Sequence, residues 1–142
     1  MPKFSDEIEP LVPIGRVREN RKALLDAVQG ILPDGETRVR DAAVDAVEEV
    51  ERDADADAVN AVVLLTDGAD TASTRSATAT VAELARQGEK EGPGQVRVFT
   101  IAYGTDADTV ELEHMAAATG GKAYEGGTDE ISSIYKSISS FF

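Results

Sequence analysis

The most informative part of the sequence is Val59-Asn60-Ala61-Val62-Val63-Leu64-Leu65, which is followed at once by Thr66-Asp67-Gly68-Ala69-Asp70. A nearly continuous apolar run of this length is typical of a strand buried on both faces, as in a parallel sheet covered by helices. The polar residues after the run are expected at the carboxyl edge of that sheet, where open α/β folds bind ligands. Gly68 is expected to let the chain turn sharply and to leave Asp67 uncovered.

Helical and strand patterns alternate on both sides of this run. Apolar residues at helical spacing predict helices over residues 19–32, 39–50, 74–87, 108–119 and 129–140. Strands are predicted over residues 96–103 and 122–124, and the proline-interrupted opening, residues 8–14, suits at best an edge strand. This order predicts the α/β class: one domain over residues 1–142, with a three-layer, doubly wound, mostly parallel sheet that has helices on both faces.

Some elements carry finer expectations. The helix at 39–50 is expected to show an acidic outer face made by Asp41, Asp45, Glu48, Glu49 and Glu51. Residues 52–58 alternate acid and alanine and are predicted to form an exposed linker. The helix at 108–119 is expected to stop at Gly120-Gly121. The last helix is expected to bury Ile131, Ile134, Tyr135, Ile138 and Phe141.

Composition excludes several classes of function. The 142 residues include 27 acids and 14 bases, for a net charge of −13, which disfavours nucleic acids and anionic membranes as partners. The charge suits cations and basic protein surfaces, although solubility alone would also explain it. Without Cys there are no disulfides, zinc–thiolate sites or cysteine nucleophiles, and the single His114 is expected on a helix surface. No apolar run is long enough to span a membrane.

Two oxygen-bearing side chains are candidates for a cation site. Residues 33–37 precede a predicted helix, so Thr37 lies near its start, while Asp67 follows the central strand. Both side chains could converge on a hard cation such as Mg²⁺, which takes about six oxygen ligands, several of them water. Taken alone, Thr37 could instead be a helix N-cap and Asp67 a turn aspartate.

The motifs resemble those of von Willebrand factor type A (vWA) domains. Residues 62–68, followed by Asp70 and Thr71, resemble the late metal-site motif of that family. Residues 33–37 resemble its middle motif, a Gly-x-Thr loop before a helix. Weaker similarities cover the rest of the chain, at Phe4-Ser5-Asp6, residues 98–104, Gly120-Gly121 and the ending from Ile131, which resembles bacterial members.

The resemblance implies a metal-ion-dependent adhesion site (MIDAS), in which a bound cation completes its shell with an acidic residue of a protein partner. By motif, Thr37 and Asp67 would be ligands of Mg²⁺, Mn²⁺ or Ca²⁺, directly or through water. Asp70 matches no ligand position. Similar bacterial members fused to a solute-binding-like domain imply a location outside the cytoplasm or at the cell surface.

One departure from the family pattern changes these expectations. The family's first motif, Asp-x-Ser-x-Ser, is absent, and the chain resembles the family only from within its second strand. The first strand and helix are therefore missing, and metal binding is expected to be weak or absent. The sequence is expected to be a piece of a longer protein. An open slot beside residues 59–65 is expected to promote a dimer, a strand exchange or filling by an extra segment.

Three functional hypotheses follow. The leading hypothesis is a non-enzymatic module that binds a protein partner through a MIDAS that lacks the first motif. An alternative is a scaffold domain without an active metal site. A remote alternative is a phosphoacceptor domain with Asp67 as nucleophile, for which Asp70 and Lys122 are the available supporting groups.

Overall fold

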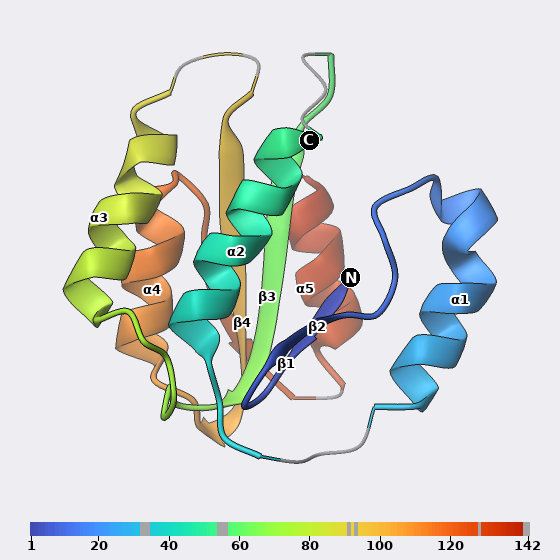
Figure 1. Cartoon of the computed structure of the whole chain (residues 1–142), viewed down its shortest axis with the longest axis horizontal. Coiled ribbons are helices and arrows are strands. Elements are labelled where there is room, and N and C mark those ends of the chain that lie inside the picture. Colours follow the sequence, from blue (N-terminus) through green and yellow to red (C-terminus); the bar gives the residue numbers. More distant parts are fainter. Residues whose placement is uncertain (32–34, 54–56, 91, 93, 128, 141–142) are drawn as a thin grey trace.

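The computed structural model describes residues 1–31, 35–53, 57–90, 92, 94–127 and 129–140. Strands and helices alternate along most of the chain, as predicted (Figure 1). In order, the elements are β1 (Pro2–Phe4), β2 (Ile8–Pro10), α1 (Val17–Gln29), α2 (Val39–Arg52), β3 (Asn60–Gly68), α3 (Ala77–Gly88), β4 (Val96–Asp106), α4 (Thr109–Ala118), β5 (Ala123–Gly126) and α5 (Ile131–Ser139).

The strands form a parallel sheet and a separate hairpin. β3, β4 and β5 lie side by side in that order, and both strand pairs are parallel. β1 and β2 form an antiparallel hairpin of their own, so the predicted opening strand exists, and β1 is an addition to the prediction. Phe4 and Ile8 of the hairpin pack against the main core rather than extend the sheet.

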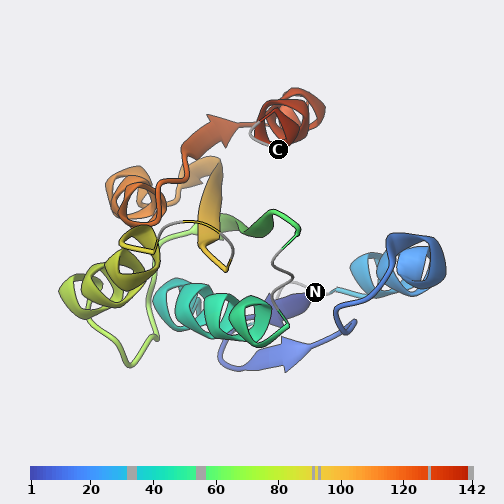
Figure 2. The same ribbon diagram turned by 90° about the horizontal axis from the view of Figure 1, so that it is seen from above.

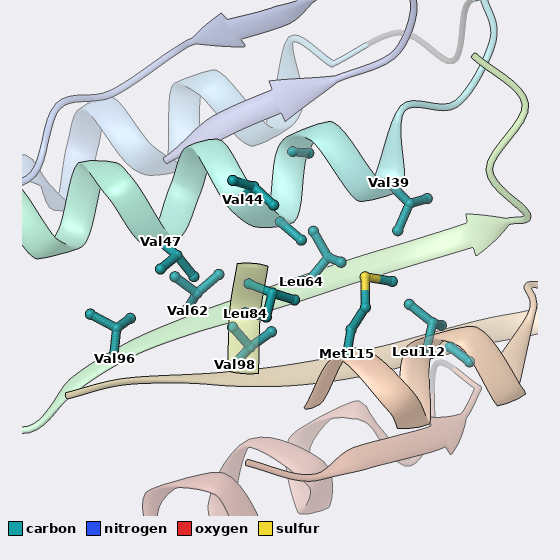
Figure 3. Packing of buried hydrophobic residues seen from close by; sticks show 13 residues of the cluster. Val39, Val44, Val47, Val62, Leu64, Leu84, Val96, Val98, Leu112 and Met115 are labelled. Carbon is teal, nitrogen blue, oxygen red and sulfur yellow. The ribbon is translucent and has the colours of Figure 1, made fainter. Parts of the chain in front are cut away.

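Helices cover the two faces of the sheet unequally. Figure 2 shows α2, α3 and α4 on one side and α5 on the other, which confirms the three-layer α/β class. The first face holds the main core, in which Val62 and Leu64 of β3 meet apolar residues of the three helices (Figure 3). The second face holds a smaller cluster around Phe99 and Ile101, covered by Ile134 and Ile138 of α5.

The expectation that residues 59–65 are buried on both faces is wrong. Burial alternates along β3: Val62 and Leu64 are buried, whereas Val63 is 38% exposed and Leu65 is 45% exposed. β3 is an outer strand of the described sheet, and α5 packs over β4 and β5. The second face of β3 therefore lacks a covering layer among the described residues.

Helix α1 stands apart from the rest of the molecule (Figure 1). It contains no buried residue, and the apolar side chains Val17, Leu25 and Val28 are each more than half exposed. An amphipathic helix normally buries its apolar stripe against a partner element. Both α1 and the second face of β3 thus present uncovered apolar surface.

Helices α4 and α5 follow most of the expectations from the sequence. Helix α4 ends as predicted, with Gly120 at φ +72°, and His114 is exposed on it. Ile134 and Ile138 of α5 are buried as expected, but Tyr135 is 48% exposed, because it lies to one side of the helix face that this pair buries. Leu32 to Asp34, Ala54 to Ala56 within the expected linker, and Phe141 lie outside the described residues. No helix in the described ranges is long and apolar enough to cross a membrane.

Candidate functional site

The site lies where β3 ends beside the start of α2. The register between β3 and β4 shifts after Thr66, which marks a bulge, and Asp67 lies at this irregularity. Bulges re-aim side chains near functional sites. The Thr66 hydroxyl donates to the carbonyl of Gly68 (3.0 Å) and accepts from its N–H (3.3 Å). This closed local arrangement leaves Asp67 exposed.

Gly68 plays a different role from the one expected. It does not adopt a positive φ, so the chain does not need glycine for a sharp turn there. A Cβ placed on Gly68 would lie 3.6 Å from Thr37 Oγ1, an ordinary contact, so this position lies against the Thr37 side chain. Thr37 therefore lies beside Gly68, the residue that follows Asp67 in the chain.

Thr37 is not the N-cap of α2. The N-cap is Arg38, whose side chain makes no capping hydrogen bond, and Thr37 precedes it. The backbone of Thr37 is held by the loop after β3: its N–H donates to Thr71 Oγ1 (2.9 Å), and its carbonyl accepts from the N–H groups of Thr71 (2.9 Å) and Ala72 (3.1 Å). The N-cap interpretation is wrong because the hydroxyl does not bond to the helix.

Asp41 holds the same loop from the first turn of α2. Its carboxylate accepts hydrogen bonds from the N–H groups of Thr74 (2.9 Å) and Arg75 (3.2 Å), and it also pairs with the Arg75 guanidinium (3.1 Å) and with Arg38 (3.2 Å). Burial raises the pKa of Asp41, but the hydrogen bonds from Thr74 and Arg75 outweigh it and hold this pKa below its ordinary value. Asp41 was expected on the exposed face, and that expectation is wrong: it is 4% exposed.

A second buried carboxylate, Asp70, is held by Arg40. The Arg40 guanidinium lies 3.4 Å from Asp70 Oδ1 and also pairs with Glu111 of α4 through its Nε. The hydrogen bond to Glu111 is the largest effect on the pKa of Arg40, which lies above its ordinary value. This chain of contacts ties the loop after β3 to α2 and α4. Sequence reasoning missed it, and no spacing in the sequence indicated it.

The hairpin also contacts the site. The N–H of Glu36 donates to Asp6 Oδ1, and the Arg38 guanidinium donates to the Asp6 carbonyl (3.2 Å). Asp6 thus fixes the segment that leads into Thr37. Its place in the turn between β1 and β2 gives the resemblance noted at Phe4-Ser5-Asp6 a physical role.

The side-chain oxygens available to bind a cation are of a suitable chemical type, but they are few. Within the described ranges, the hydroxyl of Thr37 and the carboxylate of Asp67 have no hydrogen-bond or ion-pair partner. A hydroxyl and a carboxylate suit a hard cation such as Mg²⁺. Groups of three or more metal-binding His, Cys, Asp or Glu side chains are absent from the part of the chain that the structure describes. Two protein oxygens fit a cation only if water or another chain supplies the rest.

The supporting groups of the phosphoacceptor alternative are placed elsewhere. The Asp70 carboxylate forms an ion pair with Arg40 and accepts a hydrogen bond from the Ser73 hydroxyl. Lys122 Nζ lies 5.3 Å from the centre of the Tyr124 ring, where it makes a cation–π contact. Asp70 and Lys122 are therefore engaged in contacts with residues other than Asp67.

Comparison with known proteins points to one family. The family model of the von Willebrand factor type A domain matches residues 2–136. No curated protein matches the chain. Solved structures with the same fold include proximal thread matrix protein 1 from the mussel byssus, with a TM-score of 0.71, 19% identity, and coverage of 96% of this chain and 34% of that one.

Two further structures agree in fold. The same mussel protein with a zinc-occupied MIDAS motif gives a TM-score of 0.67 and 20% identity, with coverage of 96% of this chain and 32% of that chain. A von Willebrand factor type A protein from Catenulispora acidiphila gives a TM-score of 0.70 and 17% identity, with coverage of 96% of this chain and 31% of that chain. The chain spans about a third of the length of each of these proteins.

Proposed function

Because the chain belongs to the von Willebrand factor type A domain family, we propose that it is a non-enzymatic module that binds another protein. The observation that carries the proposal is the pair of uncommitted oxygens at the end of β3. Thr37 precedes α2 and lies beside Gly68, the neighbour of Asp67, and neither its hydroxyl nor the Asp67 carboxylate has a hydrogen-bond or ion-pair partner among the described residues.

The contact is proposed to use a divalent cation. Thr37 and Asp67 would hold Mg²⁺, or Mn²⁺ or Ca²⁺ in its place, with water filling the remaining positions until an acidic side chain of the partner enters. The zinc-occupied MIDAS of the mussel protein supports this choice of site. With two protein ligands of total charge −1, affinity for the cation alone is expected to be weak, because affinity follows ligand number and charge.

Calorimetric titration with Mn²⁺ and Mg²⁺ tests the cation. We expect saturable binding that is lost in Asp67→Asn and in Thr37→Ala. Glu113→Gln is the matched control for charge, because Glu113 is exposed on α4 and away from the site. Binding that is equal in all four proteins would contradict the site.

A scaffold domain without an active metal site is the second candidate, favoured by the small number of ligands. The two candidates differ in how partner binding responds to cations. If a partner is retained equally in Mg²⁺ and in chelator, the scaffold is correct. If retention requires the cation and Asp67, the adhesion-type module is correct.

The phosphoacceptor hypothesis is separable by chemistry. Incubation with a small phosphodonor and Mg²⁺, followed by intact mass measurement, would reveal a phosphorylated Asp67. We expect no added mass, because Asp70 and Lys122 are held in other contacts.

The open edge of β3 supports a second copy of this chain as one partner. β3 has a neighbour on one side only within the described sheet, and Val63 and Leu65 are exposed on its uncovered face. The α1 segment, residues 16–30, carries four basic and two acidic residues in a chain of net charge −13. We propose that α1 of one copy covers the second face of β3 in the other, so that apolar surface and opposite charge meet.

Oligomeric state tests this arrangement. Sedimentation equilibrium is expected to show a dimer that Leu65→Asp and Leu25→Asp each convert to monomer. Val110→Asp is the control, because Val110 is 59% exposed on α4, on the opposite side of the sheet. A monomer in the unaltered chain at about 100 μM, where specific protein interfaces are normally occupied, would overturn the proposal.

A further inference from the structure

The N-terminus of α2 is capped from a distant part of the chain. The first N–H groups of a helix have no partner inside the helix and are usually satisfied by the side chain of the N-cap residue. Here Arg38 occupies the N-cap and provides no such bond. Instead the N–H of Arg40 donates to Asp70 Oδ2 (2.8 Å), and the N–H of Asp41 donates to Ser73 Oγ (3.0 Å).

Asp70 is the centre of this distant cap. Its side chain is 1% exposed. Besides the Arg40 N–H, it accepts hydrogen bonds from the hydroxyl (2.6 Å) and the N–H (3.1 Å) of Ser73 and lies 3.4 Å from the Arg40 guanidinium. Each carboxylate oxygen is thereby engaged by groups of α2 or of its own loop. A buried carboxylate that is satisfied in this way positions the backbone around it and is unavailable as a ligand.

The cap determines what Thr37 is free to do. Because Asp70 and Ser73 serve the helix, the Thr37 hydroxyl is not required as a cap. The loop that carries Asp70 continues into Thr71 and Ala72, which fix both the N–H and the carbonyl of Thr37. Thr37 Oγ1 thereby lies 3.6 Å from the place that a Gly68 Cβ would occupy.

We propose that Asp70 is the positioning residue of the site: it caps α2 from the loop after β3 and so holds the Thr37 hydroxyl beside Asp67 before any cation arrives. The placement of Thr37 follows from the contacts within the chain, while its use for a cation rests on the proposed function. Asp70, three residues beyond Asp67, is therefore not a ligand, in line with its lack of a matching ligand position in the sequence.

Native-state hydrogen exchange, followed residue by residue by NMR, tests the positioning. Asp70→Ala is expected to speed hydrogen exchange at the Thr71 and Ala72 amides about tenfold more than at the Val98 amide in β4. A tenfold difference corresponds to the free energy lost with one helix cap. Ser76→Ala is the matched control. It removes the local cap of α3, the bond from the Ala79 N–H to Ser76 Oγ (3.2 Å), and leaves the loop at Asp70 intact.

Two results would overturn the proposal. One is that Asp70→Ala lowers the protection of the Thr71 and Ala72 amides from hydrogen exchange no more than it lowers that of the Val98 amide. The other is an unchanged nuclear Overhauser effect between the Thr37 methyl and the Gly68 α-protons in Asp70→Ala. If that variant does not fold, Asp70→Asn and Ser73→Ala remove part of the same set of bonds and are expected to show the same localised effect to a smaller degree.

Titration of the same proteins with Mn²⁺ separates this proposal from the proposed function. We expect weaker Mn²⁺ binding in Asp70→Ala and unchanged binding in Ser76→Ala. If the unaltered chain binds no Mn²⁺, the cation function fails while the exchange data still decide the role of Asp70. If Asp70→Ala binds Mn²⁺ as well as the unaltered chain does, Asp70 does not position the site.

Discussion

The two faces of the sheet differ more than any other regions of the molecule. The face under α2, α3 and α4 holds a continuous apolar core, with Leu84 and Met115 fully buried (Figure 3). The opposite face is covered over β4 and β5 and open over β3. The site lies at the end of β3 beside the start of α2, a helix of the closed face that carries Asp41 and follows Thr37. The fold thus anchors its candidate site on the well-packed side and leaves apolar surface for association on the other.

Neighbouring residues of β3 give the sharpest test of this contrast. Leu64 is 4% exposed on the closed face, and Leu65 is 45% exposed on the open one. Leu64→Ala is expected to lower the free energy of unfolding by about 2–5 kcal/mol, because it removes buried apolar volume and leaves a cavity. Leu65→Ala is expected to change it by less than about 0.5 kcal/mol, measured by urea denaturation at low protein concentration.

Equal losses of unfolding free energy in Leu64→Ala and Leu65→Ala would contradict this difference between the two faces. They would mean that the second face of β3 is covered in solution even at low concentration. A loss at Leu65 that grows with protein concentration would instead support coverage by a second copy.

Asp41 is expected to give the next largest effect. Asp41→Ala removes the acceptor of several hydrogen bonds from Thr74 and Arg75 and leaves those donors without it, at a cost of about 1–3 kcal/mol. Asp45→Ala is the control on the same helix, because Asp45 is 45% exposed and forms one ion pair with Arg75 (3.3 Å). That pair is worth about 0–1 kcal/mol. A loss at Asp45 as large as that at Asp41 would contradict the importance of the buried network.

The sequence predicted the layout of the molecule better than its polar contacts. Hydrophobic spacing and glycines located the helices and strands, and a strand followed by Thr66-Asp67-Gly68 placed Asp67 at the correct edge. The burial of Asp41 and Asp70 could not be predicted in that way, because their partners lie about 30 residues away in the chain and spacing along one helix says nothing about them. The same limit explains the error at residues 59–65: an apolar run indicates a strand, and neighbouring elements decide whether both of its faces are covered.

The lowered pKa of Asp41 predicts how the network responds to acid. Above the ordinary aspartate pKa of about 3.9 the carboxylate is charged in both states, and its contribution to stability is complete. As the pH falls from that value through the lower pKa of the folded state, the unfolded chain binds the proton first, so stability is lost. Urea denaturation of the unaltered chain and of Asp41→Asn between about pH 6 and pH 3 should show the difference between them shrinking as the pH falls.

Glu51 must be separated from this effect, because hydrogen bonds from Lys90 and Gln87 also hold its pKa below the ordinary value. It lies at the far end of α2 and is unaffected by the substitution at Asp41. A stability difference between the two proteins that stays constant over the same pH range would show that the Asp41 carboxylate has the same pKa in both states.

A small change in stability is expected at Gly68, and it tests the link between the start of α2 and the site. The φ of Gly68 is not positive, and an added Cβ would meet Thr37 Oγ1 at 3.6 Å, an ordinary contact. Gly68→Ala should therefore change the free energy of unfolding by less than about 1 kcal/mol. The same methyl would stand beside the proposed cation ligands, so Mn²⁺ binding should weaken in the folded variant. Gly127→Ala is the control, since a Cβ there would meet no atom within 4 Å. If Gly68→Ala keeps both its stability and its Mn²⁺ affinity, the cation is not held between Thr37 and Asp67, and the space beside Gly68 serves packing alone.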